Sequence, residues 1–142
     1  MSTIKEVQDE IIDEFAGLSD WMDKYSYIIE LGNAVEPLEE KCKTLENIIE
    51  GCQSRVWLVA DECDGKIVFR ADSDAIIVKG LISMLIRVLS GHTPQEILDA
   101  DLYFLKEIGL QEHLSPTRSN GLLAMIKQMR VYALAYKAKL EN

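Results

Sequence analysis

The chain has 142 residues, of which 48% are hydrophobic and 27% charged, and its formal net charge is −9. This length and composition predict one globular domain over residues 1–142 and exclude a disordered chain. The negative charge argues against nucleic acid as a partner, because phosphate backbones would be repelled. We also expect no membrane partner and a cytoplasmic protein, since no apolar stretch is long enough to span a bilayer and no secretory signal opens the chain.

The first part of the chain predicts two helices. Thr3 and Glu6 form a capping box, and apolar residues then recur at helical spacing to about residue 18. Asp20 is placed to cap a second helix, and Gly32 and Asn33 supply residues typical of a helix end.

The middle of the chain predicts three short strands after a polar loop over residues 33–46. The strand candidates are 47–51, 54–60 and 66–71, and Asp64-Gly65 is a hairpin turn signal between the last two. Three strands joined by short turns form a small antiparallel sheet, which needs helices on one face to be stable.

The second half predicts a buried helix followed by shorter helices and a long one. Residues 75–90 are apolar nearly all round, with Ser73-Asp74 as the N-cap and with Gly80 allowing close packing. Thr93 and Glu96 form a capping box before a helix expected at 94–100, and further helices are expected at 102–108 and 116–140. The expected inner face of the last helix consists of Leu122, Met125, Ile126, Met129, Ala133 and Tyr136. Helices, then strands, then helices predict an α+β fold with the helices packed on one face of the sheet.

Three cysteines, Cys42, Cys52 and Cys63, are candidates for chemistry. An odd number without a CxxC pair argues against a disulfide framework, so at least one thiol should be free. Cys42 and Cys63 are expected to be incidental thiols, and the acidic neighbours of Cys63 disfavour a thiolate.

Cys52 has different neighbours. Gly51 before it frees the backbone to turn, and the polar pair Gln53-Ser54 and the cation Arg55 follow it. Backbone N–H groups in a turn and a nearby cation favour a thiolate. The residues therefore predict a solvent-presented thiol that could act as a nucleophile.

Two other chemistries remain open from the residues. The cysteines with His92 or His113 could hold a metal ion, but their spacings are not those of known zinc or iron–sulfur motifs, and we predict no metal site. A cysteine hydrolase would need one of these histidines as a base for Cys52, although both are expected to make local hydrogen bonds in loops.

A polar segment precedes the last helix. Ser115, Thr117, Ser119 and Asn120 could cap this helix, whereas Arg118 would face the positive end of the helix dipole. A residue placed against local preference indicates a partner elsewhere, either a surface carboxylate or a functional group.

Taken together, these segments resemble the SufE family of sulfur-acceptor proteins, from about Asp20 to the final helix. The motifs that carry the resemblance are Asp20-Trp21, Ile29-Glu30-Leu31-Gly32, Gly51-Cys52-Gln53-Ser54 followed by Val56-Trp57, Ser73-Asp74-Ala75, Thr93-Pro94, and His113-Leu114-Ser115-Pro116-Thr117-Arg118-Ser119-Asn120-Gly121-Leu122.

The resemblance implies a role in iron–sulfur cluster assembly rather than a stand-alone enzyme activity. Members of the family accept sulfur as a persulfide from a SufS-type cysteine desulfurase, activate that enzyme, and deliver the sulfur to a SufBCD-type scaffold. On the motif match, Cys52 is the acceptor, and no cofactor is implied for the chain itself. The implied fold resembles that of IscU, so an iron–sulfur or zinc-binding scaffold of the IscU type is the alternative.

The resemblance also suggests roles for the residues around Cys52. Arg118 matches a family arginine expected to stabilise the thiolate or to dock a partner, and Asp74 matches an aspartate that caps a helix or acts in a switch. Gly51 gives the loop its freedom, while Gln53 and Ser54 are expected to hydrogen-bond it.

The loop of an unpartnered family member can pack against an apolar pocket. Here we expect Trp57 or the helix at 75–90 to form the wall of that pocket. Two residues depart from the family pattern, namely Arg55, where glutamine is common, and Cys63.

Overall fold

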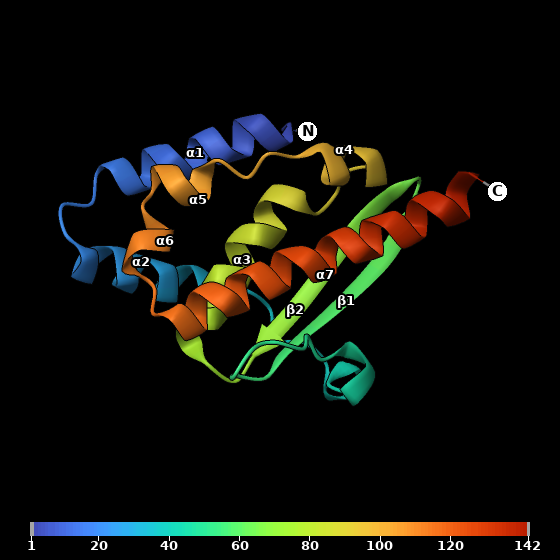
Figure 1. The fold of residues 1–142 in the computed structure, drawn as a ribbon, viewed down its shortest axis with the longest axis horizontal. Coiled ribbons are helices and arrows are strands. Elements are labelled where there is room, and N and C mark those ends of the chain that lie inside the picture. Colours follow the sequence, from blue (N-terminus) through green and yellow to red (C-terminus); the bar gives the residue numbers. More distant parts are fainter. Residues whose placement is uncertain (1, 142) are drawn as a thin grey trace.

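The computed structural model describes residues 2–141 and has an α+β fold (Figure 1), which confirms the predicted class. Its elements follow one another as α1 (Ile4–Ala16), α2 (Trp21–Asn33), the short 3-10 helices η1 (Glu40–Cys42) and η2 (Leu45–Asn47), β1 (Val56–Cys63), β2 (Lys66–Ser73), α3 (Ile76–Leu89), α4 (Pro94–Asp99), α5 (Phe104–Glu107), α6 (Leu110–His113) and α7 (Pro116–Glu141).

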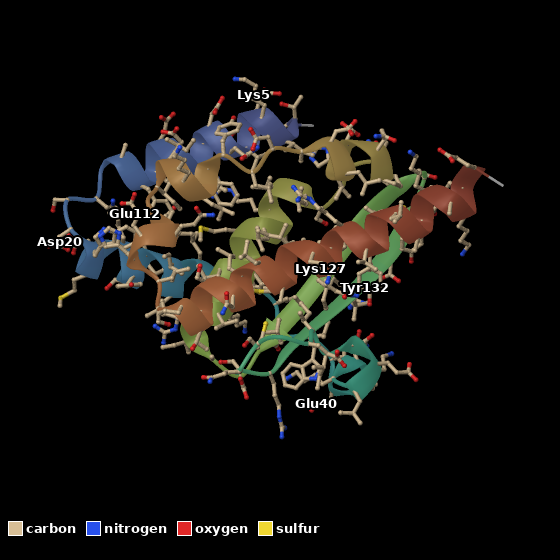
Figure 2. All side chains as sticks on the ribbon, in the orientation of Figure 1. Lys5, Asp20, Glu40, Glu112, Lys127 and Tyr132 are labelled. Carbon is tan, nitrogen blue, oxygen red and sulfur yellow. The ribbon has the colours of Figure 1, made fainter. Side chains whose placement is uncertain are left out.

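Side-chain caps begin both N-terminal helices, as predicted. The Thr3 hydroxyl accepts a hydrogen bond from the Glu6 backbone N–H at 3.1 Å, and the Glu6 carboxylate accepts one from the Thr3 N–H at 3.1 Å. The carboxylate of Asp20, at one end of the molecule (Figure 2), accepts a hydrogen bond from the Asp23 N–H at 2.9 Å. Each cap satisfies a backbone donor that the helix itself leaves unpaired.

Helices α2 and α3 cross with their backbones in contact. A Cβ atom on Gly80 would lie 2.1 Å from the Ile28 carbonyl oxygen, and one on Gly32 would lie 2.7 Å from the Gly80 nitrogen. Gly80 therefore allows close packing, as predicted. The helix end predicted at Gly32-Asn33 is confirmed, because α2 ends at Asn33, and Gly32 in its last turn is also required for the crossing.

The two strands form a long antiparallel hairpin, β1 with β2. Asp64 and Gly65 occupy its turn with φ angles of 52° and 79°, the left-handed geometry expected for this sequence. Cys63 pairs with Lys66 directly beside the turn. The predicted hairpin is thus confirmed.

The third strand predicted at 47–51 is wrong, since the sheet within residues 2–141 has two strands. This segment contributes one isolated bridge at Ile48, and the Ile49 N–H donates a hydrogen bond to the Val56 carbonyl at 2.8 Å. Pairing stops there because Gly51, with a φ angle of +95°, turns the chain away from β1.

Helix α3 lies at the centre of the core. Ten of its 14 residues are buried, which confirms the prediction of burial on most sides. It packs against α2 and β2 and also contacts α1 and α7 (Figure 1). The predicted cap by Ser73-Asp74 is wrong, because Ala75 occupies the N-cap position without a side-chain hydrogen bond and Asp74 binds elsewhere.

Three short helices connect α3 to α7. The predicted capping box of Thr93 and Glu96 begins α4. The helix expected at 102–108 is shorter, and Gly109, with a φ angle of 79°, separates α5 from an unpredicted α6.

Helix α7 begins at Pro116 and packs along α4 and α3 (Figure 1). Five side chains of its predicted inner face are buried, those of Leu122, Met125, Ile126, Met129 and Ala133, and the sixth, Tyr136, is half-buried. No helix within residues 2–141 is both long and apolar enough to cross a membrane. The N-terminal turns of α7 lie beside the segment that carries Cys52, and this places the candidate site.

Candidate functional site

Cys52 lies on a loop that connects the bridge segment to β1, which we call the Cys52 loop (residues 50–55). The hydrogen bond between the Ile49 N–H and the Val56 carbonyl closes the base of this loop. Residues 50–55 therefore form a short loop that leaves the hairpin at this hydrogen bond and are not part of the sheet.

A second attachment holds the C-terminal end of the Cys52 loop. The Arg55 N–H donates to the Asp74 carboxylate at 3.0 Å, the Asp74 N–H donates to the Arg55 carbonyl at 3.2 Å, and the Ser73 hydroxyl donates to the same carbonyl at 2.8 Å. Asp74 thus anchors the loop, and the switching role implied by the family resemblance stays a prediction.

Gly51 has a steric role as well as a conformational one. Its φ angle of +95° is one that side chains with a Cβ rarely adopt, and an added Cβ would lie 3.2 Å from the Cβ of Ala124 on α7. Glycine therefore lets the Cys52 loop pack directly against this helix.

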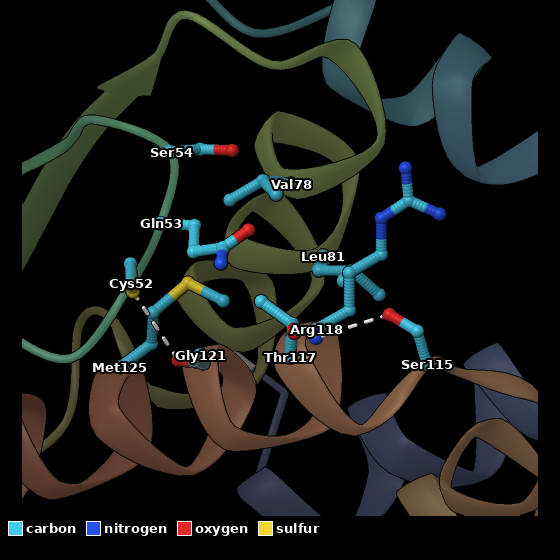
Figure 3. A pocket seen from close by; sticks show the side chains of 10 residues that line it. All are labelled: Cys52, Gln53, Ser54, Val78, Leu81, Ser115, Thr117, Arg118, Gly121 and Met125. Atoms are coloured by element: carbon cyan, nitrogen blue, oxygen red, sulfur yellow. Dashed lines mark hydrogen bonds between the residues drawn. The ribbon is translucent and has the colours of Figure 1, made fainter.

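The thiol of Cys52 points towards α7 (Figure 3). Its Sγ atom donates a hydrogen bond to the Gly121 carbonyl oxygen at 3.5 Å, and the residue is half-buried. The prediction of a thiol presented to solvent is therefore wrong for this conformation. The thiol is covered because a glycine at position 121 leaves room for it beside the helix backbone.

Burial raises the pKa of the Cys52 thiol above its usual value. A thiolate in this position would lose hydration, and the carbonyl oxygen that faces it has no proton to donate. The sequence argument for a lowered pKa is wrong here, because it counted neighbours along the chain and not the helix packed over the thiol. Burial in the closed loop therefore favours the protonated thiol over the thiolate.

A pocket of about 390 Å³ opens beside Cys52 (Figure 3). Val78 and Leu81 of α3 supply apolar wall, as expected, whereas Trp57 is not among the lining residues and instead lies under the Lys43 ammonium group. The lining residues are Cys52, Gln53, Ser54, Val78, Leu81, Ser115, Thr117, Arg118, Gly121 and Met125.

Arg118 rises from the first turn of α7 on the side of the pocket opposite Cys52 (Figure 3). Its backbone N–H donates to the Ser115 hydroxyl at 3.3 Å, so Ser115 caps the helix as predicted. The Arg118 guanidinium forms no ion pair with a carboxylate of the described chain, so the expected surface carboxylate is not its partner. The pocket therefore carries an unpaired positive charge.

Gln53 and Ser54 line the pocket but do not hold the loop. Within the described residues their side chains make no hydrogen bond, so the expectation that they brace the loop is wrong. The sequence argument missed Gly121 and Met125, which cover the thiol from one face of α7. Their spacing of four residues on a predicted helix was the available signal.

The other two cysteines lie elsewhere. Cys42 is half-buried in η1, Cys63 is exposed beside the hairpin turn, and all three thiols are free. Within residues 2–141, cysteine, histidine and acidic side chains form no group of three that could hold a metal ion.

Neither histidine lines the pocket. His92 is buried, and its backbone carbonyl accepts a hydrogen bond from the Ile67 N–H at 2.9 Å. The ring of His113 stacks on Trp21 with their centroids 3.9 Å apart. Nδ1 of His113 also lies 3.1 Å from the Gly109 carbonyl oxygen, a local hydrogen bond of the kind expected. The hydrolase hypothesis is left without a base beside Cys52.

Comparisons with known proteins place this geometry in a family. A solved structure, described as the solution structure of a hypothetical protein from Thermus thermophilus, has the same fold, with a TM-score of 0.75 and 21% sequence identity over 93% of this chain and 96% of that chain. The family model for SufE, the Fe-S metabolism associated domain, matches residues 9–133, which include every residue of the pocket. The chain therefore belongs to the SufE family.

Proposed function

We propose that this protein accepts sulfur from a SufS-type cysteine desulfurase as a persulfide on Cys52, activates that enzyme, and delivers the sulfur to a SufBCD-type scaffold. In this role it is a carrier rather than a stand-alone enzyme. The observation that supports this most directly is a half-buried thiol on a loop whose firm attachments lie at its two ends.

The transfer is a thiol exchange in which one sulfur atom moves. The Cys52 thiolate attacks the outer sulfur of the donor persulfide, a new S–S bond forms at Cys52, and the old S–S bond breaks. The donor cysteine leaves as a thiolate, and Cys52 becomes a persulfide. No external oxidant or reductant is needed, because the sulfur oxidation states are exchanged between the two proteins.

The loop must open for this step. In the closed state the half-buried thiol faces the backbone of α7, and opening of the loop presents it to the donor persulfide. The contact to be broken is a weak S–H···O interaction of 3.5 Å together with apolar packing. The hydrogen bonds of Ile49 and Arg55 lie on either side of Cys52 and can act as fixed points while the loop opens.

The pocket supports storage of the product. A volume of about 390 Å³ exceeds what one added sulfur atom requires, and Val78, Leu81 and Met125 offer apolar contact to a persulfide. A persulfide returned to this pocket is removed from thiol reductants in solution, which must reach the outer sulfur to reduce it.

Arg118 supplies the charge that the closed thiol lacks. Its guanidinium is unpaired within the described chain and lies at the side of the pocket across from Cys52. Once the loop moves, this cation can approach and stabilise the Cys52 thiolate and the persulfide anion that replaces it. Docking of an acidic group of the donor is its other use in the same step.

The carrier role is better supported than that of an IscU-type scaffold. A cluster scaffold needs several ligands that converge, whereas Cys42, Cys52 and Cys63 lie in η1, in the Cys52 loop and at the hairpin turn. The described residues offer no group of three ligands for a metal ion.

Mass spectrometry of the protein after incubation with the cognate desulfurase and L-cysteine tests the proposal. We expect the mass of one sulfur atom on the peptide that contains Cys52, and its loss in Cys52→Ser. The double variant Cys42→Ser/Cys63→Ser should load normally and serves as the matched control. Labelling confined to Cys42 or Cys63, or stoichiometric metal bound after anaerobic purification, would refute the carrier role.

A further inference from the structure

A carboxylate lies buried near the end of β2, close to the attachment of the Cys52 loop. Asp72 is 4% exposed, and among the described residues it is the only acidic side chain that is buried. It precedes by two residues Asp74, whose carboxylate holds the loop at Arg55. Burying a charge is costly unless partners surround it, and the partners of Asp72 show what it holds together.

Each oxygen atom of the Asp72 carboxylate faces two donors. Oδ1 accepts a hydrogen bond from the Ser73 N–H at 2.8 Å and lies 3.4 Å from the Lys79 ammonium group. Oδ2 accepts one from the Leu38 N–H at 3.0 Å and lies 3.5 Å from the Lys43 ammonium group. Burial alone would raise the pKa of Asp72, but the two backbone N–H groups and the Lys79 charge lower it below its usual value. The position therefore requires a side chain with two acceptor atoms and no proton.

The first set of contacts leads to the attachment of the Cys52 loop. Asp72 binds the N–H of Ser73, and the Ser73 hydroxyl donates to the Arg55 carbonyl at 2.8 Å. Asp74 comes next in the chain and makes two hydrogen bonds with the backbone of Arg55. Asp72 is thus bonded to the backbone segment from which both attaching side chains extend.

The two lysines extend these contacts to the base of the loop and to the pocket wall. The Lys43 ammonium group lies 5.5 Å from the ring centroid of Trp57, which follows Val56 at the base of the loop. Lys79 follows Val78, which forms part of the pocket wall. The lysine side chains are only 22% and 19% exposed, so these ion pairs are not those of mobile surface side chains.

We infer that Asp72 is a positioning residue for sulfur transfer, because it joins the attachment, the base and the pocket wall of the Cys52 loop and so holds the loop closed over a stored persulfide. This inference rests on the proposed function. Asp72 does not line the pocket, so it acts on Cys52 through Ser73 and Asp74. Its loss should raise the fraction of molecules in which the loop is open.

A second cluster around a carboxylate provides a matched comparison. The Glu14 carboxylate accepts hydrogen bonds from two N–H groups of Arg87 at 2.8 and 2.5 Å, and the Tyr27 hydroxyl also donates to it. None of these three residues lines the pocket. Substitution of Glu14 therefore removes an ion pair but no hydrogen bond of the Cys52 loop or of its attachments.

Alkylation of Cys52 by iodoacetamide in native buffer tests the inference. The amide of Asp72→Asn has one acceptor oxygen, so the N–H of either Ser73 or Leu38 loses its acceptor. We expect alkylation to be about fivefold faster, the factor that one lost hydrogen bond of average strength gives. Its midpoint pH should also move down towards that of the unfolded chain, because an open loop leaves the thiol hydrated. Glu14→Gln makes the same chemical change and should alter neither the rate nor the midpoint.

A double variant separates positioning from stability. Asp72→Asn leaves the Lys43 and Lys79 ammonium groups facing an uncharged amide, and the added Lys79→Met removes one of these charges. We expect Asp72→Asn/Lys79→Met to regain part of the free energy of unfolding in urea denaturation. It should keep the fast alkylation, because two backbone N–H groups still compete for one acceptor. Should Asp72→Asn alone be too unstable to fold, the double variant carries the same comparison with Glu14→Gln.

Loading by the cognate desulfurase separates this inference from the proposed function. On loaded protein we expect glutathione, whose thiolate takes the outer sulfur and leaves Cys52 as a thiolate, to remove the persulfide about fivefold faster in Asp72→Asn than in Glu14→Gln. If the unaltered protein is never loaded, the carrier role fails, while the alkylation rates still report on Asp72. Equal alkylation rates in Asp72→Asn and Glu14→Gln, or a return to the slow rate in the double variant, would overturn the positioning role.

Discussion

The Cys52 thiol and the Gly121 carbonyl oxygen lie 3.5 Å apart although the two residues are 69 positions apart in the chain. This contact ties the Cys52 loop to the first turns of α7 and covers the sulfur atom. It also favours the protonated thiol, because a carbonyl oxygen accepts a proton donor and cannot stabilise a thiolate. The reactivity of Cys52 is therefore set by whether the loop is closed.

The pH dependence of Cys52 alkylation follows from this contact. Burial raises the pKa of the thiol in the folded state, so the rate of reaction with iodoacetamide should reach half its maximum at a higher pH in native buffer than in urea. The contribution of this group to the free energy of unfolding is complete below the pKa of the unfolded chain and is lost as the pH rises through the folded pKa. Peptide-resolved mass spectrometry measures both profiles, and a native midpoint at or below the unfolded one would contradict the closed state.

Removal of the Asp74 carboxylate should loosen the loop. In Asp74→Ala the Arg55 N–H loses its acceptor at 3.0 Å, so we expect Cys52 to be alkylated several-fold faster and the free energy of unfolding to fall by about 1 kcal/mol. Asp13→Ala removes an exposed carboxylate of α1 with the same change in net charge and is the matched control. Equal Cys52 alkylation rates in the two variants would show that Asp74 does not restrain the loop.

Local signals in the sequence predicted much of the fold. The caps at Thr3, Asp20 and Thr93 and the turn at Asp64-Gly65 depend on residues a few positions apart, and the structure has all of them. The wrong predictions concern features that depend on residues far apart in the sequence. Residues 47–51 have strand-like composition, but a third strand needs a neighbour to pair with, and the chain turns away at position 51.

The site shows the same division. A glycine followed by a cysteine and polar residues was enough to single out Cys52, because that pattern is local. The state of the thiol was not predictable, since the group that covers it, the backbone at Gly121, comes from the far end of the chain. Arg118 was identified from its unfavourable place at a helix start, and its lack of a carboxylate partner could be learned only from the fold.

Two glycines with left-handed φ angles distinguish the effect of backbone strain from that of packing against α7. Gly51→Ala and Gly65→Ala should each cost about 1 kcal/mol of stability, because alanine is strained at φ angles of +95° and +79°. An alanine Cβ at position 51 would also meet the Cβ of Ala124 at 3.2 Å, whereas nothing lies within 4 Å at position 65. We therefore expect faster alkylation of Cys52 in Gly51→Ala only, with partial reversal when Ala124→Gly is added. Equal acceleration in Gly65→Ala would show that backbone strain alone opens the loop.

The crossing of α2 and α3 should be the least tolerant position in the fold. In Gly80→Ala the new Cβ would lie 2.1 Å from the Ile28 carbonyl oxygen, and backbone atoms cannot move aside without separating the two helices. We expect a loss of about 3 kcal/mol or more in the free energy of unfolding, measured by urea denaturation. Gly17→Ala adds the same methyl group where nothing lies within 4 Å and φ is −81°, so it should be neutral or stabilise by about 0.5 kcal/mol. A Gly80→Ala protein as stable as Gly17→Ala would mean that the helices do not cross in backbone contact, and α3 could then not hold the pocket wall at Val78 and Leu81 where Cys52 requires it.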